Sequence, residues 1–269
     1  MFTGVDDGAN PLGSLTFGWS GALYGTSLFG GALGGGTVFE LAPPASGTEN
    51  WTLNVVHSFG AAGDGSGPCA GVVFDKEHNL FGTTASGGAS QFWGTVFKLR
   101  RAPVHSGEWI ETVLFSFDNG ADGGEPFGSL IFDKRGDVYG TSGFGGVFGH
   151  GTVFELVPTS GGGWVQSVLY SFFDGTDGGL PNAGLILDGQ GDLYGTAESG
   201  GEAGAGTAFE LKPPLQTGDP WTQLTLYSFS NSPDGAVPQS PLVFGPGGDL
   251  YGTTWAGGNN HGTVFQVAP

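Results

Sequence analysis

One six-residue motif occurs five times along the chain at nearly constant spacing. It reads Gly-Thr-Val/Ala-Phe-x-Leu/Val, and its five copies begin at Gly36, Gly94, Gly151, Gly206 and Gly262. Successive copies are separated by 58, 57, 55 and 56 residues. A period of this length marks one supersecondary unit copied in tandem. We therefore expect residues shared by all five copies to serve architecture, and functional residues to lie where the copies differ.

Each unit is predicted to contain four short β-strands, named A to D in chain order. In the third copy these are residues 129–133, 137–141, 151–156 and 164–172. The runs are rich in β-branched and aromatic residues and are bounded by Gly, Pro or Asp, as strands are. No segment shows a helical period with caps. The unit is therefore a small antiparallel sheet.

Five such sheets predict an all-β fold, a five-bladed β-propeller of about 56-residue four-stranded repeats. Strand A is apolar on consecutive residues, which suits the innermost strand of a blade. Because the repeat runs through the whole chain, we expect residues 1–269 to form one propeller domain. The predicted blades are approximately 12–59, 69–117, 127–172, 182–229, and 239–269 together with 1–2.

The last blade is predicted to lack its outer strand. The sequence reaches Pro269 just after strand C of the fifth copy, whereas residues 1–2 align with the end of a strand D. An uncovered edge at 262–267 could pair with a strand from another chain or from a second copy. The alternative is that the sequence is a piece cut from a longer chain.

The composition excludes several classes of partner. The chain has 25 acidic and 7 basic side chains, a net charge of −18, which repels nucleic acid and anionic lipid. The single cysteine, Cys69, excludes an internal disulfide and a cysteine-based zinc site. The sequence contains no run of 18 apolar residues, so no membrane-spanning helix is predicted. The first ten residues have neither the basic nor the apolar segment of a signal peptide, although an extracellular protein could begin after its signal peptide was removed.

The repeated sequence motifs also resemble those of a known family. Asp-Leu-Tyr-Gly-Thr-Thr at 249–254, Gly257-Gly258 and the motif at 262–267 have counterparts in every copy. Together they resemble the Gloeo/Verruco (GloVer) tandem repeat over essentially the whole chain. The resemblance implies a bacterial, extracellular or cell-surface repeat protein, in some members with a C-terminal sorting or anchoring signal. It supplies no catalytic motif, so no catalytic residue is assigned.

The connection from strand D to the next strand A always contains Asp-Gly-x-x-Pro, and begins at Asp7, Asp64, Asp122, Asp177 and Asp234. A turn accounts for this pattern, because aspartate caps backbone N–H groups, glycine adopts positive φ and proline ends pairing. No cofactor is required, but calcium is a candidate ligand. Its oxygen ligands would come from Asp118, Asn119 and Asp122, or from Asp174 and Asp177, without the spacing of a full calcium loop.

The loops between strands B and C share Gly-Thr-x-x-x-Gly-Gly but differ at the variable positions. The candidate ligand-binding residues there are Phe29, Trp93, Phe144, His150, Trp255, Asn259, Asn260 and His261. Aromatic rings beside amides suit a sugar, whose apolar face stacks on the ring while its hydroxyls bind polar groups. The alternative is that these rings fill gaps between blades. His57 occupies the strand D position of Tyr170 and Tyr227, where we expect it to pack.

These patterns favour a secreted bacterial protein that binds extracellular carbohydrate or another surface ligand through its B–C and D–A loops. Several near-equivalent blades would give avidity. One alternative is an assembly module whose open fifth blade is completed by another chain. A second is a carbohydrate-active enzyme, a glycoside hydrolase or lyase, with Glu125 or Glu198 as the acid. Binding is favoured over catalysis because the blades are nearly identical and no nucleophile elbow, phosphate loop or metalloprotease motif is present.

Overall fold

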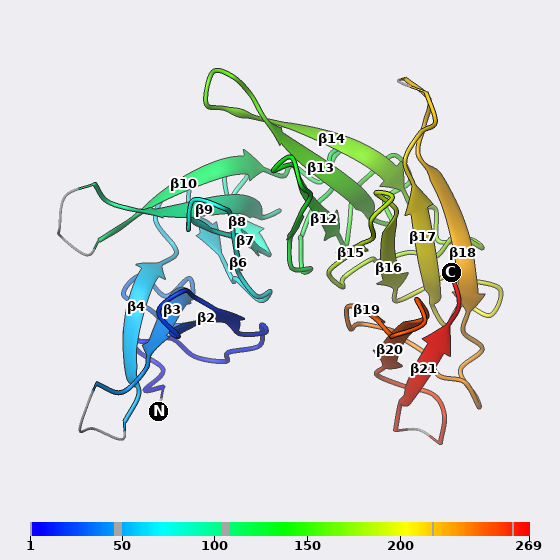
Figure 1. Ribbon diagram of the computed structural model, residues 1–269, viewed down its shortest axis with the longest axis horizontal. Helices are drawn as coiled ribbons and strands as arrows, with labels where there is room; N and C mark the ends of the chain where they lie inside the picture. Colours follow the sequence, from blue (N-terminus) through cyan, green and yellow to red (C-terminus); the bar gives the residue numbers. More distant parts are fainter. Residues whose placement is uncertain (1, 46–49, 104–107, 217, 260) are drawn as a thin grey trace. The chain divides into compact units, whose positions relative to one another are not determined.

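The computed structural model describes residues 2–45, 50–103, 108–216, 218–259 and 261–269. Every regular element in these residues is a β-strand (Figure 1). No helix with the length and apolar character of a membrane span is present in this described part of the chain. The chain separates into two compact units. Unit 1 is Met1–Asp118 with Glu125–Leu130, and unit 2 is Asn119–Gly124 with Ile131–Pro269.

Unit 1 holds the sheets of the first two repeats. Blade 1 consists of β1 (Thr16–Phe17), β2 (Leu23–Ser27), β3 (Thr37–Ala42) and β4 (Thr52–Ser58). Blade 2 consists of β6 (Val73–Phe74), β7 (Leu80–Thr84), β9 (Thr95–Arg101) and β10 (Trp109–Ser116). A separate two-stranded sheet pairs β5 (Gly65–Ser66) with β8 (Ser86–Gly87). In each blade the strands follow chain order and run antiparallel.

Unit 2 holds the remaining three sheets. Blade 3 consists of β11 (Ile131–Phe132), β12 (Val138–Ser142), β13 (Thr152–Pro158) and β14 (Trp164–Ser171). Blade 4 consists of β15 (Ile186–Leu187), β16 (Leu193–Ala197), β17 (Thr207–Lys212) and β18 (Thr222–Ser228). Blade 5 has three strands, β19 (Val243–Phe244), β20 (Leu250–Thr254) and β21 (Thr263–Val267). The five-bladed β-propeller fold, with a last blade that lacks its outer strand, is confirmed.

Strand A is shorter than the sequence predicts. In blade 3 only Ile131 and Phe132 pair with β12, and Asp133 then caps the following turn by accepting hydrogen bonds from three backbone N–H groups. The residues just before strand A bond to the preceding blade instead. The threonine of Tyr-Gly-Thr donates its hydroxyl proton to a carbonyl there, as Thr141 does to Ala183 over 2.9 Å. At this point a side-chain hydrogen bond therefore takes the place of the backbone hydrogen bonds between paired strands.

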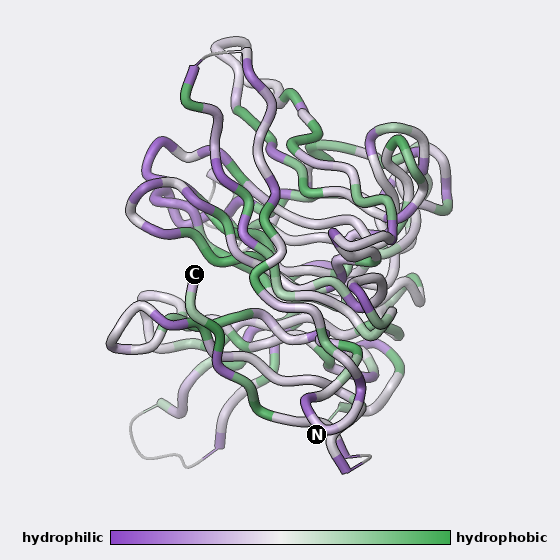
Figure 2. The backbone as a smooth tube through the Cα atoms, turned by 90° about the vertical axis from the view of Figure 1, so that its right-hand side faces the viewer, coloured by the Kyte–Doolittle hydropathy of each residue, from purple (hydrophilic) through white to green (hydrophobic). Residues whose placement is uncertain are grey.

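The repeated aromatic residues make the core, as expected for residues shared by all copies. The phenylalanine that ends strand D packs on the strand C phenylalanine of the next blade, and both side chains are buried. Ring centroids are 4.9 Å apart for Phe59 and Phe97, and 5.1 Å for Phe172 and Phe209. Phe2 packs in the same way on Phe39, at 5.0 Å. Figure 2 shows hydrophobic and hydrophilic stretches alternating over short distances, as short strands joined by polar turns require.

Candidate functional site

The B–C loops and the D–A connections are hydrogen-bonded to one another within each unit. Isolated β-bridges join Ala9 to Phe29, Gly124 to Phe144, Gly179 to Ser199 and Ala236 to Ala256. In four of the five copies, the residue before the proline also donates its N–H to the end of the preceding B–C loop. Leu180 bonds to the carbonyl of His150 and Val237 to that of Ala205, both over 2.9 Å. These loops are therefore held by backbone bonds, as binding loops on a rigid scaffold are.

The aspartates of Asp-Gly-x-x-Pro are engaged in turns. Both oxygens of Asp177 accept hydrogen bonds, from the hydroxyl of Tyr170 (3.0 Å) and from the N–H groups of Phe173 and Gly175. Gly178, the next residue, has φ of +97°, and an added Cβ would lie 2.4 Å from Thr207 Oγ1. Asp174 Oδ1 accepts from the hydroxyl of Ser199 over 2.6 Å. The motif thus combines a side-chain cap with a glycine-only backbone conformation.

The candidate calcium residues are not gathered into a compact carboxylate group. Among the described residues, only one group of three His, Cys, Asp or Glu side chains has ligand atoms within 4.8 Å of one another, and it contains none of the predicted residues. Asp174 and Asp177 already serve the turn contacts given above. Asn119 lies in the left-handed region with φ of 63°. Calcium binding at either predicted set stays a prediction.

The candidate ligand-binding rings are exposed in several blades. Trp255 is 75% exposed, Phe29 53% and Phe144 38%. Trp93 is half-buried, while the side chain of His150 is 42% exposed with its Nδ1 3.9 Å from Asp174 Oδ2. Asn259 and His261 are exposed, and Asn260 lies outside the described residues. Exposure at this level argues against the interpretation that Phe29 and Trp255 fill gaps between blades.

Three polar side chains meet on the loops of unit 2. Glu198 Oε1 accepts a hydrogen bond from Asn182 Nδ2 over 2.8 Å and another from Gln239 Nε2 over 2.6 Å. We name Asn182, Glu198 and Gln239 the Glu198 cluster. Both bonds reach the same carboxylate oxygen, so Glu198 Oε2 accepts no hydrogen bond from Asn182 or Gln239. Asn182 Oδ1 is buried and accepts no hydrogen bond from the described residues.

Trp255 is tied to the same segment that supplies Gln239. Its N–H donates to the carbonyl of Val237 over 3.0 Å, and Glu198 N–H donates to that of Leu180 over 3.1 Å. Leu180 and Val237 have φ of 55° and 58°, which is strained for a side chain of their size. Such strain persists where the surrounding bonds over-determine the conformation, and it concentrates at functional sites. The loops thus hold an exposed indole and a carboxylate–amide cluster in fixed positions.

The equivalent positions of unit 1 carry different chemistry. Glu125 has φ of 51°, and its N–H donates to the carbonyl of Trp93 over 2.9 Å. Burial raises the pKa of Glu125 above its usual range. Cys69 follows the proline of its connection, and burial raises the pKa of its thiol to about 11, with a smaller contribution from Glu125. Cys69 therefore stands where unit 2 has the amide of Asn182, while Trp93 and Glu125 stand at the positions of His150 and Leu180.

The sequence did not identify Asn182 and Gln239 as site residues. Both stand directly after the proline of Asp-Gly-x-x-Pro, where the five copies have Leu12, Cys69, Phe127, Asn182 and Gln239. A comparison of copies at this position would have shown two adjacent amides in blades 4 and 5. Their contact with Glu198 depends on the packing of neighbouring blades, which no spacing within one repeat reveals.

Comparison with solved structures supports the fold. A Bacteroides uniformis protein provisionally assigned as a 6-phosphogluconolactonase aligns with a TM-score of 0.55 and 15% identity, over 94% of this chain and 69% of that one. A Dyadobacter fermentans protein of unknown function gives 0.52 and 11%, over 98% and 85%. The sialidase of Trypanosoma rangeli gives 0.51 and 10%, over 91% and 44%. At these identities the likeness is one of fold alone.

No curated protein sequence matches the chain. The profile of the Gloeobacter/Verrucomicrobia repeat matches residues 1–209 and 104–269, and the two overlapping matches together span all five copies. This match confirms the family resemblance that the repeated motifs indicate. The chain belongs to the Gloeobacter/Verrucomicrobia repeat family.

Proposed function

We propose that the loops of unit 2 bind carbohydrate. The observation that carries this proposal is the position of Trp255, which is 75% exposed and whose backbone N–H bonds to Val237 in the segment that presents Gln239 to Glu198. A flat ring covers the apolar face of a pyranose, and a carboxylate flanked by amides binds its hydroxyl groups. Because backbone bonds fix these loops, little ordering would be needed on binding.

Two further observations support the proposal. The solved structures of similar fold include a sialidase and a protein assigned to a sugar-phosphate reaction, so this fold is used for sugars elsewhere. The exposed rings of Phe29 and Phe144 occupy related loops in blades 1 and 3. Weak sites on several blades would act together on a polymeric ligand. We infer an extracellular or cell-surface location from the family resemblance.

The test is a glycan array followed by titration calorimetry with the best polysaccharide. Trp255→Ala should weaken binding roughly 10- to 100-fold, the range expected when about 1.5–3 kcal/mol of aromatic contact is lost. Glu198→Ala should weaken it as well. Trp51→Ala is the matched control, since Trp51 is 47% exposed but lies at the start of an outer strand. Binding that survives combined replacement of Trp93, Phe144 and Trp255 by alanine would contradict the proposal.

The same samples distinguish binding from catalysis. If the site were enzymatic with Glu198 as the acid, incubation with the bound polysaccharide would release shorter products, and Glu198→Gln would abolish their release. A binding site predicts no released product from either protein. Reducing-end assays and chromatography read out both outcomes.

A second candidate function is assembly through the outer edge of blade 5. In the described residues, β21 pairs only with β20, and Val264 is 80% exposed whereas its counterparts Val96 and Val153 are fully buried. An edge of this kind accepts a strand from another chain. Light scattering should then show a dimer, and Val264→Lys should return it to a monomer. A wild-type chain that stays monomeric at high concentration would contradict self-assembly.

A further inference from the structure

Three metal-ligating side chains meet between the outer strands of blades 1 and 2. His57 lies on β4, Glu111 on the neighbouring β10, and Asp64 in the connection that follows β4. His57 Nε2 is 3.3 Å from Asp64 Oδ2, and the ligand atoms of all three lie within 4.8 Å of one another. All three residues belong to unit 1. They lie outside the predicted loop residues.

The other blades show what normally occupies this place. Between blades 3 and 4, the hydroxyl of Tyr170 donates to Asp177 Oδ2, and Gln223 Nε2 donates to the carbonyl of Asp177 over 3.2 Å. In blade 4, Tyr227 donates to Asp234 in the same way over 2.6 Å. The standard arrangement is therefore an aspartate whose carboxylate accepts from a phenol and from backbone N–H groups, and whose backbone carbonyl accepts from an amide. It needs no ion.

At the interface of blades 1 and 2 both donors are replaced. His57 stands where Tyr170 and Tyr227 stand, and Glu111 stands where Gln223 stands. Two changes thus meet at one place, and each brings in a side chain that can bind a metal. His57 Nε2 keeps a hydrogen bond with Asp64 Oδ2, whereas Glu111 replaces an amide donor by a carboxyl group. Glu111 Oε1 is buried and accepts no hydrogen bond from the described residues.

The changes leave two carboxyl groups close together in a partly buried place. The ligand oxygens of Glu111 and Asp64 lie within 4.8 Å of each other, and Asp64 is 9% exposed. A buried carboxylate pair is unfavourable unless a proton or a cation lies between the oxygens. The neighbouring imidazole is a group that binds transition metals far better than it binds calcium or magnesium. The donor set therefore distinguishes between cations.

One imidazole nitrogen and two carboxylate oxygens form a ligand set suited to zinc. Tetrahedral zinc with bonds of about 2.0–2.1 Å places its ligand atoms roughly 3.3 Å apart. The 3.3 Å between His57 and Asp64 already matches this separation, and the remaining distances need small side-chain adjustments. Three protein ligands leave one position for water or an added ligand.

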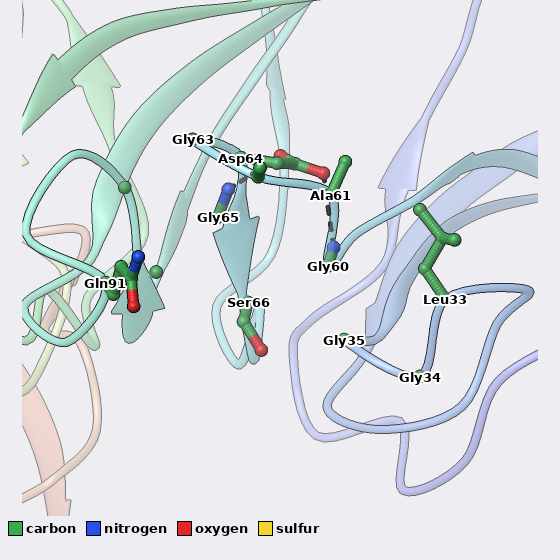
Figure 3. A pocket seen from close by; sticks show the side chains of 13 residues that line it. Leu33, Gly34, Gly35, Gly60, Ala61, Gly63, Asp64, Gly65, Ser66 and Gln91 are labelled. Carbon is green, nitrogen blue, oxygen red and sulfur yellow. Dashed lines mark hydrogen bonds between the residues drawn. The ribbon is translucent and has the colours of Figure 1, made fainter.

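Asp64 is oriented by its surroundings and lines a hollow in the surface of unit 1. Its Oδ2 accepts from Gly60 N–H over 3.2 Å and its Oδ1 from Gly65 N–H over 2.6 Å, which fixes the carboxylate as outer-shell bonds do in metal sites. The hollow that Asp64 lines has a volume of about 580 Å³. Figure 3 shows Asp64 across from the loop that carries Gln91. The side chain of His57 is 20% exposed. Of the three residues, Asp64 lines this hollow, and His57 is partly exposed to solvent.

We propose that His57, Asp64 and Glu111 form a binding site for a divalent transition-metal ion, with Zn²⁺ as its preferred occupant. The site belongs to unit 1 and is independent of the carbohydrate proposal for unit 2. The internal repeats provide the experiment, since they show which residues restore the metal-free arrangement. His57→Tyr with Glu111→Gln rebuilds the interface of blades 3 and 4.

The test uses the full chain after dialysis against EDTA and then buffer. Titration calorimetry with ZnCl₂ should show one equivalent bound, and Co²⁺ should give the visible absorption of a low-symmetry nitrogen–oxygen site. His57→Tyr/Glu111→Gln should weaken Zn²⁺ binding roughly 100-fold or more, because loss of an outer-shell partner alone costs 10–100-fold. The double variant should keep the wild-type circular dichroism spectrum, since Tyr and Gln are native to this position in other blades.

His78→Asn controls for loss of any imidazole. His78 is exposed in the turn between β6 and β7 with φ of 67°, a conformation that asparagine tolerates. Its Zn²⁺ affinity should equal that of the wild type. In the opposite direction, Tyr170→His/Gln223→Glu should create a second equivalent around Asp177. Wild-type protein that binds no Zn²⁺, or a His57→Tyr/Glu111→Gln variant that binds it unchanged, would overturn the proposal in favour of a proton shared by the two carboxyl groups.

Discussion

Gly195→Ala should destabilise the protein although it adds only one methyl group. Gly195 is the central residue of β16, in the repeated Tyr-Gly-Thr, and its φ is not in the left-handed region. A Cβ built there would lie 2.6 Å from Phe209 Cζ and 2.8 Å from Leu185 Cδ2. Carbon atoms in contact prefer about 3.5–4.0 Å, so both neighbours must move by roughly 1 Å. The perturbation is therefore steric.

The expected cost follows from that overlap. Overpacking of a well-filled core costs about 1–3 kcal/mol. Replacing glycine also removes chain entropy from the unfolded state, which offsets roughly 0.4–1 kcal/mol. The net loss should be about 1–2 kcal/mol, or roughly 2–8 °C in Tm for a chain of this size. Phe209 is fully buried, which leaves its ring little room to retreat.

Urea denaturation followed by tryptophan fluorescence measures this change. Gly189→Ala is the matched control, because a Cβ at Gly189 meets nothing within 4 Å and its φ is ordinary. It should change stability by no more than about 0.5 kcal/mol or raise it slightly. Phe209→Leu combined with Gly195→Ala should cost less than the sum of the two single variants. A Gly195→Ala protein as stable as the Gly189→Ala protein would refute the reasoning.

Three further outcomes are expected. Val153→Ala should cost about 1.5–3 kcal/mol, whereas Val264→Ala should stay within about 0.5 kcal/mol, because the first valine is fully buried and the second 80% exposed; thermal melts compare them. Cys69, whose pKa is raised by burial from 9.0 to about 11, should react with iodoacetamide at pH 8 roughly 100-fold more slowly than in the urea-unfolded chain, as mass spectrometry would show. Tyr170→Phe should cost about 1 kcal/mol in urea denaturation through the lost bond to Asp177, and an unchanged midpoint would contradict that role.

The fold could be predicted because every local signal repeats five times. A single copy of Gly-Thr-Val-Phe would be a weak indication of a strand. Its recurrence about every 56 residues indicates that all five copies form the same local structure. The length of strand A could not be predicted, because its apolar run reads as continuous strand. Contacts such as Thr141 to Ala183, between blades, decide where its ladder ends. The hydrophobicity of the sequence does not show whether a backbone group bonds to a neighbouring strand or to a side chain.

The candidate sites could be predicted only in part. Trp255 and Glu198 were visible because they break the pattern of their own loop. Asn182, by contrast, lies 16 residues from Glu198 and becomes a partner only through the fold. His57 and Glu111 are further apart still, on the outer strands of two blades. Each looked like an ordinary departure from the repeat when judged alone.

Comparing the five repeats distinguishes residues that maintain the fold from residues that could bind a ligand. A lone replacement, such as Phe115 for Tyr170, removes a hydrogen bond that a blade can do without. A paired replacement at one interface is different, because His57 and Glu111 both bring metal-ligating atoms toward Asp64, and Glu111 also replaces an amide donor by a carboxyl group. Stability alone favours the tyrosine and glutamine arrangement used elsewhere in the chain. Because these two changes meet in space, they support the proposal of a cation site, whereas a lone change does not.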